Sequence, residues 1–176
     1  MHLKKTYAMA VAALAAALSV VLLLIGVYIP INTLFFTAMA AYMIGYSIQK
    51  CGLRYGGIHL AAGVLLDLFL IPDKFNWILF LCLGGYIFAS EVIFQKGNKV
   101  QDPKKKLRVQ LICNWILFNT IYIPLLMFGR ELFLTGDISA GAPVIWLAGQ
   151  VGWIVYDKGY RVFFQTILVR NMSDGR

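Results

Sequence analysis

The chain has few of the residues and motifs that carry catalysis or bind nucleotides. It contains no Gly-Lys dipeptide, which the phosphate-binding loop of P-loop ATPases requires. The H-E-x-x-H and G-x-S-x-G motifs are also absent, and His2 and His59 are its only histidines. We therefore expect a protein that is not an enzyme and has no catalytic residues, metal or cofactor. Any energy that its function needs would come from a partner or a gradient.

Cysteine is also scarce, and its spacing is uninformative. Cys51, Cys82 and Cys113 lie in or beside apolar runs and form no C-x-x-C pair. The pattern therefore favours reduced packing residues over a disulfide or a zinc site.

Charged residues make up only 14% of the 176-residue chain, whereas 60% of it is hydrophobic. A soluble protein of this composition would have an insoluble surface, so we expect an integral membrane protein. The net charge of +8 could suggest nucleic acid. However, the basic residues lie in short loops between apolar runs, where anionic lipid and cytoplasmic retention explain them. We expect anionic lipid as a partner and no nucleic acid.

The apolar runs predict an all-α membrane protein with six transmembrane helices in a single domain. The expected spans cover about 7–29, 34–48, 53–71, 77–94, 109–128 and 142–156. Every Lys and Arg except Lys74 and Arg130 lies in alternate loops or the two tails, with Arg54 at the edge of its span, and therefore on one side. Because translocating basic loops is unfavourable, that side is cytoplasmic, and both termini lie there. We expect a multi-pass protein of a cell membrane, such as the bacterial plasma membrane.

Two features at the ends of the predicted spans refine this topology. The tail over 158–170 keeps enough apolar residues for a helix that could lie along the inner membrane surface. Ala8, Ala12 and Ala16 recur every four residues in the first span and form a smooth strip on one helix face. Such a strip lets another helix approach closely, either from a partner protein or from within the bundle.

Apart from Arg54 at the inner end of its span, the predicted spans contain His59, Asp67 and Glu91, and an unpaired charge within a membrane is costly. His59 and Glu91 lie near the inner ends of consecutive spans and could pair with each other. The simpler interpretation is an ion pair or solvated groups at the interface. Asp67 lies toward the outer end of its span, where it could cap a helix, meet water or contact a ligand.

The last two spans each place an amide side chain between aromatic residues on one helix face. The two sets are Trp115, Asn119 and Tyr122, and Trp146, Gln150 and Trp153. A flat, hydrogen-bonding small molecule would need such a pocket. The alternative is that the amides join neighbouring helices and the aromatic rings mark the membrane interface.

Three stretches carry a family resemblance. Ala12-Ala13-Leu14-Ala15-Ala16-Ala17-Leu18 resembles the first helix by which substrate-binding S components of energy-coupling factor (ECF) transporters dock on their transmembrane partner. Ile29-Pro30-Ile31-Asn32-Thr33-Leu34 and Gly52-Leu53-Arg54-Tyr55-Gly56 resemble that family's first outer loop and second inner turn. The first outer loop is shorter here than is common in the family.

The resemblance implies a vitamin-type ligand bound toward the outer half, mainly among the later spans. It also implies a transmembrane coupling subunit and separate ATPase subunits as partners. We accordingly expect Asn119, Gln150, Trp146, Trp153, Tyr122 and Asp67 to bind substrate, and Ala8, Ala12 and Ala16 to bind a partner. Two alternatives remain. One is a membrane scaffold of cell-envelope assembly resembling the rod-shape protein MreD, and the other is an intramembrane enzyme that depends on His59 or Glu91.

Overall fold

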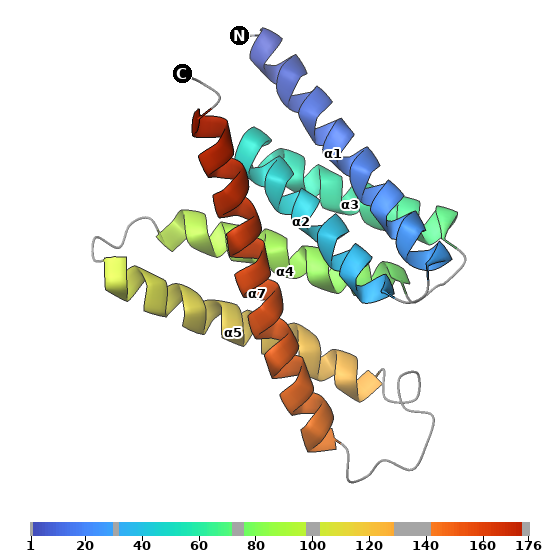
Figure 1. Cartoon of the computed structure of the whole chain (residues 1–176), viewed down its shortest axis with the longest axis vertical. Coiled ribbons are helices and arrows are strands. Elements are labelled where there is room, and N and C mark those ends of the chain that lie inside the picture. Colours follow the sequence, from blue (N-terminus) through green and yellow to red (C-terminus); the bar gives the residue numbers. More distant parts are fainter. Residues whose placement is uncertain (1, 30–31, 72–75, 98–102, 129–141, 174–176) are drawn as a thin grey trace. The chain divides into compact units, whose positions relative to one another are not determined.

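The computed structural model describes residues 2–29, 32–71, 76–97, 103–128 and 142–173, which are helical throughout apart from short turns (Figure 1). The helices are α1 (His2–Tyr28), α2 (Thr33–Cys51), α3 (Leu53–Leu70), α4 (Asn76–Gly97), α5 (Pro103–Phe128) and α7 (Ala142–Ser173). No strand occurs within these ranges. The all-α class expected from the sequence is confirmed.

Four of these helices contain a segment long and apolar enough to cross a membrane. The segments are Lys5–Tyr28 in α1, Leu53–Leu70 in α3, Asn76–Lys96 in α4 and Leu107–Met127 in α5. By the same measure of length and hydropathy, α2 and α7 fall short. The chain is therefore compatible with a multi-pass membrane protein.

The described chain divides into two compact units. Unit 1 comprises Met1–Leu117 and unit 2 comprises Phe118–Arg176, so the division falls inside α5. Each unit is described by itself below.

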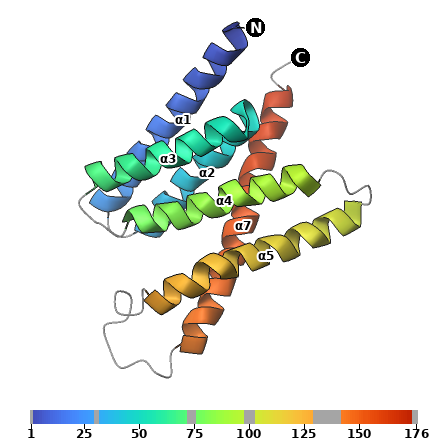
Figure 2. The ribbon, with the colours of Figure 1, turned by 180° about the vertical axis from the view of Figure 1, so that it is seen from behind.

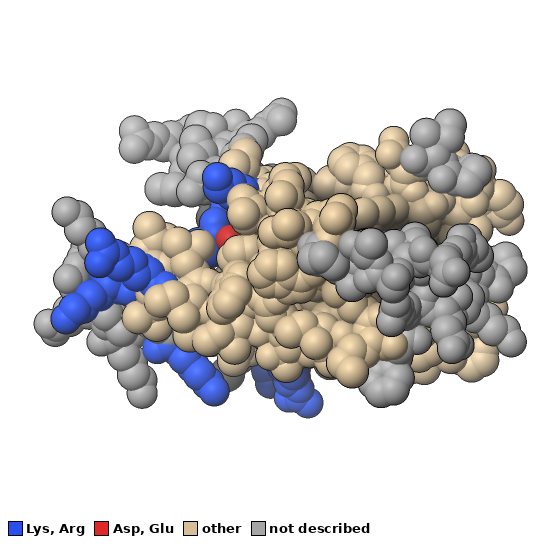
Figure 3. Space-filling model, turned by 90° about the horizontal axis from the view of Figure 1, so that it is seen from below, with Lys and Arg blue, Asp and Glu red and all other residues tan. Residues whose placement is uncertain are grey.

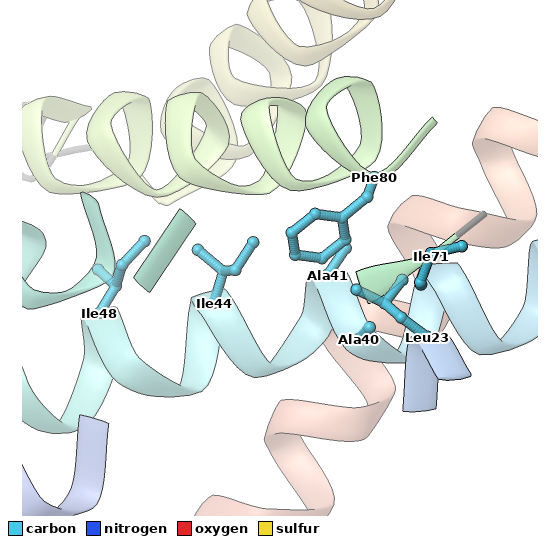
Figure 4. Close-up of a cluster of buried hydrophobic side chains, with 7 residues drawn as sticks. All are labelled: Leu23, Ala40, Ala41, Ile44, Ile48, Ile71 and Phe80. Atoms are coloured by element: carbon cyan, nitrogen blue, oxygen red, sulfur yellow. The ribbon is translucent and has the colours of Figure 1, made fainter. Parts of the chain in front are cut away.

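Unit 1 is organised around α2, which contacts α1, α3 and α4 (Figures 1 and 2). Its core joins Leu23 of α1 to four residues of α2, to Ile71 after α3, and to Phe80 of α4 (Figure 4). The four residues of α2 are Ala40, Ala41, Ile44 and Ile48. α2 contains threonine, serine and tyrosine, which lower its hydropathy, and other helices of unit 1 cover much of it.

Glycines let these helices approach closely. A Cβ at Gly84 would lie 2.6 Å from the side chain of Ile44 and 2.9 Å from that of Leu60, which is too close without a shift. Gly52 has a different role, because its φ of +97° suits glycine and makes the one-residue turn from α2 into α3. Its N–H donates to the carbonyl oxygen of Ile48 at 2.8 Å and closes the last turn of α2.

The last helix includes both the expected span over 142–156 and the expected tail helix over 158–170. α7 runs without interruption through 142–156 and on to Ser173, so the tail continues the same helix. Asp157 and Arg161 form an i,i+4 ion pair at 2.9 Å where the break was expected, and no proline lies there. This pair supports a continuous helix across the boundary.

Candidate functional site

His59 of α3 is 2% exposed and joins three helices of unit 1. Its Nε2 lies 3.0 Å from the Ser19 hydroxyl of α1, and its Nδ1 lies 2.7 Å from the Ser47 hydroxyl of α2. The Ser19 hydroxyl also lies within hydrogen-bond distance of the carbonyl oxygens of Ala15 and Ala40. Both ring nitrogens of His59 are therefore satisfied inside the protein.

Glu91 has a different partner, and the anticipated pairing with His59 does not occur. Its Oε1 accepts a hydrogen bond of 3.3 Å from the Gln49 amide of α2, and Glu91 is 7% exposed. The sequence predicted a similar depth in the membrane for His59 and Glu91. However, the two ring nitrogens of His59 form hydrogen bonds with Ser19 and Ser47. The arrangement of His59 is that of a helix tie.

Asp67 belongs to a second buried polar cluster in unit 1. Asn76, the first residue of α4, donates from Nδ2 to the Asp67 oxygens at 3.2 and 3.5 Å. The Asn76 Oδ1 lies 3.2 Å from the Thr37 hydroxyl of α2. Asp67, Asn76 and Thr37 are only 2%, 3% and 1% exposed. The cluster connects α2, α3 and α4 where α3 ends and α4 begins.

Sequence reasoning missed the neutral members of these clusters. Ser19, Ser47, Thr37 and Asn76 are small polar residues at or near the depth of an ionisable residue on an adjacent helix. Matching depths across antiparallel helices could have selected them as candidates. Their exact pairing required the rotation of each helix, which the sequence does not give.

Unit 2 brings together the two amides that the sequence singled out. Gln150 of α7 donates from Nε2 to Oδ1 of Asn119 on α5 at 3.1 Å. Tyr122 donates its hydroxyl hydrogen to the Ile145 carbonyl oxygen at 2.8 Å. These two bonds connect the same pair of helices on neighbouring turns.

Aromatic rings lie beside this pair of amides. The Phe118 ring stacks on Tyr122 at a centroid distance of 5.0 Å and on Trp153 at 5.9 Å. Phe118 was not among the predicted site residues. Trp146, the other expected wall, is 38% exposed, and Trp115 belongs to unit 1, where it is 45% exposed. The structure thus assembles Asn119, Gln150, Tyr122 and Trp153 with Phe118.

Two glycines of α7 have different surroundings, one crowded and one open. A Cβ at Gly149 would overlap the Tyr122 ring, so this glycine permits the contact between α5 and α7. A Cβ at Gly152, three residues further on, would meet nothing within 4 Å. Gly152 is therefore an exposed position that the described residues leave unfilled.

The alanine strip of α1 lies partly inside unit 1. Ala12 is 8% exposed, and Ala8 and Ala16 are half-buried. The Ala8 carbonyl oxygen accepts a hydrogen bond of 3.1 Å from the Cys51 thiol of α2. Ala12 therefore packs within the chain, while Leu14 on another side of α1 is 74% exposed.

Comparison with protein-family models, with characterised proteins and with solved structures gives no match for this chain. The residues themselves limit its chemistry. Among the residues that the structure describes, no three His, Cys, Asp or Glu side chains gather into a metal-binding set. The amide pair of unit 2, like the His59 and Asp67 clusters, bonds protein groups to one another.

Proposed function

We propose that the chain is a membrane-embedded subunit that binds a small molecule for uptake, like the S component of an ECF transporter. Transport would be energised by separate ATPase subunits through a transmembrane coupling subunit. In this proposal α2 and the first part of α7 join α1, α3, α4 and α5 as spans, giving six. The contacts of α2 with α1, α3 and α4 explain how a less apolar helix could cross the membrane.

The distribution of basic residues supports cytoplasmic termini. Within unit 1 the described Lys and Arg side chains lie where α1, α3 and α5 begin and where α2 and α4 end. They are Lys5, Lys50, Arg54, Lys96, Lys105 and Arg108. Figure 3 shows Lys and Arg side chains gathered toward one end of the view, with mainly other residue types elsewhere. Anionic lipid headgroups would meet this basic end on the cytoplasmic side.

The amide pair of unit 2 is the observation that carries the binding proposal. Gln150 donates a hydrogen bond to Asn119 next to the stacked rings of Phe118 and Trp153. A flat ligand could exchange the bond between them for its own bonds to Asn119 and Gln150, while Tyr122, Trp146 and Trp153 provide apolar walls. Such exchange retains satisfied polar groups, which is the condition for burying them.

A coupling subunit could dock on α1 only through a side that the chain leaves accessible. Ala12 is buried against its own chain, and Ala8 and Ala16 are half-buried. Ala13 and Ala17, next to this strip, are exposed and small. We therefore place the partner of α1 on the side that includes Ala13 and Ala17.

Mass spectrometry of small molecules released from gently purified protein tests the proposal. We expect a ligand to be retained by the wild type and by Glu91→Gln, because Glu91 lies in unit 1 on Gln49. Asn119→Leu and Gln150→Leu should each weaken retention roughly ten- to a hundredfold, since an unpaired buried amide partner costs about 1–3 kcal/mol. If Glu91→Gln eliminates binding while both leucine variants retain the ligand, the site lies elsewhere.

A membrane scaffold of cell-envelope assembly is the second candidate. It is favoured by the direct bond between Asn119 and Gln150, which is also what a helix tie would look like. A scaffold should copurify with envelope-assembly proteins and release no small molecule. A binding subunit should copurify with an ATPase and release one.

A further inference from the structure

Asp67 is a nearly buried carboxyl group in an apolar helix of unit 1. It lies in the last turn of α3 and is 2% exposed. Burying a charged carboxylate is costly unless its oxygens are hydrogen-bonded, and a carboxyl group within a membrane span is a functional candidate for that reason. The hydrogen bonds from Asn76 to Asp67, and between Asn76 and Thr37, bear on the two states of this carboxyl group, charged and neutral.

The charged state is satisfied by the arrangement with the Asn76 amide nitrogen toward Asp67. In this arrangement Asn76 Nδ2 donates to the carboxylate at 3.2 and 3.5 Å, and the Thr37 hydroxyl donates to Asn76 Oδ1 at 3.2 Å. The contacts of Asn76 with Asp67 and with Thr37 then each have one donor and one acceptor.

The neutral state is satisfied by the same three side chains after the Asn76 amide turns over. The protonated Asp67 oxygen would donate to the amide oxygen, and the amide nitrogen would donate to the Thr37 oxygen. The Thr37 hydroxyl has one hydrogen, which would then go to the Thr33 carbonyl oxygen. That oxygen lies 2.9 Å from the hydroxyl, nearer than the 3.2 Å to Asn76. The three side chains can therefore stay hydrogen-bonded to one another with Asp67 in either state.

We propose that Asp67, Asn76 and Thr37 form a reversible proton-binding site in unit 1, with the Asn76 amide turning over as the proton arrives and leaves. The step is balanced, because the carboxylate and one proton give the carboxylic acid and no other bond changes. The site consists of residues of unit 1 and not of the amide pair of unit 2. It would bind a proton in addition to the small molecule of the proposed function. In the proposed topology it lies near the outer ends of α3 and α4.

The other titratable residues described in the helices packed around Asp67 lie elsewhere on those helices. On α3 the nearest is His59, two turns earlier, and on α2 it is Tyr42, beyond Thr37. Others on these helices are Lys5 and Tyr7 on α1, Tyr46, Lys50 and Cys51 on α2, Arg54 and Tyr55 on α3, and Cys82, Tyr86, Glu91 and Lys96 on α4. Tyr28 ends α1 on the same side of unit 1 as Asp67, and it is 82% exposed. Asp73 and Lys74 fall outside the described residues.

Infrared difference spectroscopy of the full chain in lipid nanodiscs, between alkaline and acid pH, tests the site. A protonated carboxylic acid has its own carbonyl band. We expect that band to rise on acidification in the wild type and in Glu91→Gln, which removes the other nearly buried carboxyl group described in unit 1. In Asp67→Asn the Asp67 contribution should be missing. An Asp67→Asn spectrum identical to that of the wild type overturns the proposal.

A second variant keeps the test decisive if Asp67→Asn does not fold. Thr37→Val retains the carboxyl group but removes the hydroxyl that serves both hydrogen-bond patterns. We expect the pH at which the carbonyl band appears, and the frequency of that band, to differ from the wild type. A Thr37→Val spectrum that matches the wild type in both respects also overturns the proposal.

Discussion

Glycines that lie close together in the sequence differ in the space available for a side chain. At Gly149 an added Cβ would overlap the ring of Tyr122, whereas at Gly152 it would meet nothing within 4 Å. Gly84 and Gly85 repeat the contrast in unit 1, because only Gly84 is crowded, by Ile44 and Leu60. The crowded members of the two pairs are required by packing, and the open members are not.

The Gly149→Ala and Gly152→Ala variants turn this contrast into a prediction. Gly149→Ala should destabilise unit 2 by about 1–3 kcal/mol, because the aromatic ring of Tyr122 must move away to accommodate the methyl group. Gly152→Ala should be neutral or stabilising by about 0.5–1 kcal/mol, because alanine restricts the unfolded chain more than glycine does. Thermal unfolding in detergent measures both. Equal melting temperatures for the two variants would contradict the packing seen at Tyr122.

On the scale of the element, α1 presents two different sides. Ala12, Ala15, Ser19 and Leu23 follow one another at helical spacing and are all nearly buried. Leu14, Leu18 and Val21 are 74%, 47% and 49% exposed on another side. The buried side holds unit 1 together, and the exposed side is free for lipid or for a partner.

Tryptophan substitutions separate these two sides of α1. Ala12→Trp should prevent folding or lower the melting temperature strongly, since overfilling a packed interface costs about 1–3 kcal/mol or more. Ala17→Trp, on an exposed position, should leave the isolated protein folded and should weaken its association with a coupling subunit. Size-exclusion chromatography and copurification read out folding and association separately. An Ala12→Trp protein that folds and melts at the wild-type temperature would show that α1 does not pack as the structure describes.

The sequence predicted the helices and their order, because long apolar runs and the breaks between them are local properties. It also placed Asn119 and Gln150 at similar depth, and the structure brings them into contact. The sequence could not predict that His59 forms hydrogen bonds with Ser19 and Ser47 and not with Glu91. That choice depends on the rotation of three helices about their axes, and hydropathy is insensitive to rotation.

For the whole molecule, the distribution of charge yields the last prediction. Basic residues described in unit 1 lie at the end where α1 begins and α2 ends, and the proposed topology places that end in the cytoplasm. Single cysteines at Ser139 and Asn98, in a background lacking Cys51, Cys82 and Cys113, test the orientation in intact cells. An impermeant thiol reagent should label position 139 from outside, and position 98 only after the membrane is opened. Labelling of position 98 alone in intact cells would contradict this orientation. It would indicate the opposite topology, in which nearly all basic loops have crossed the membrane.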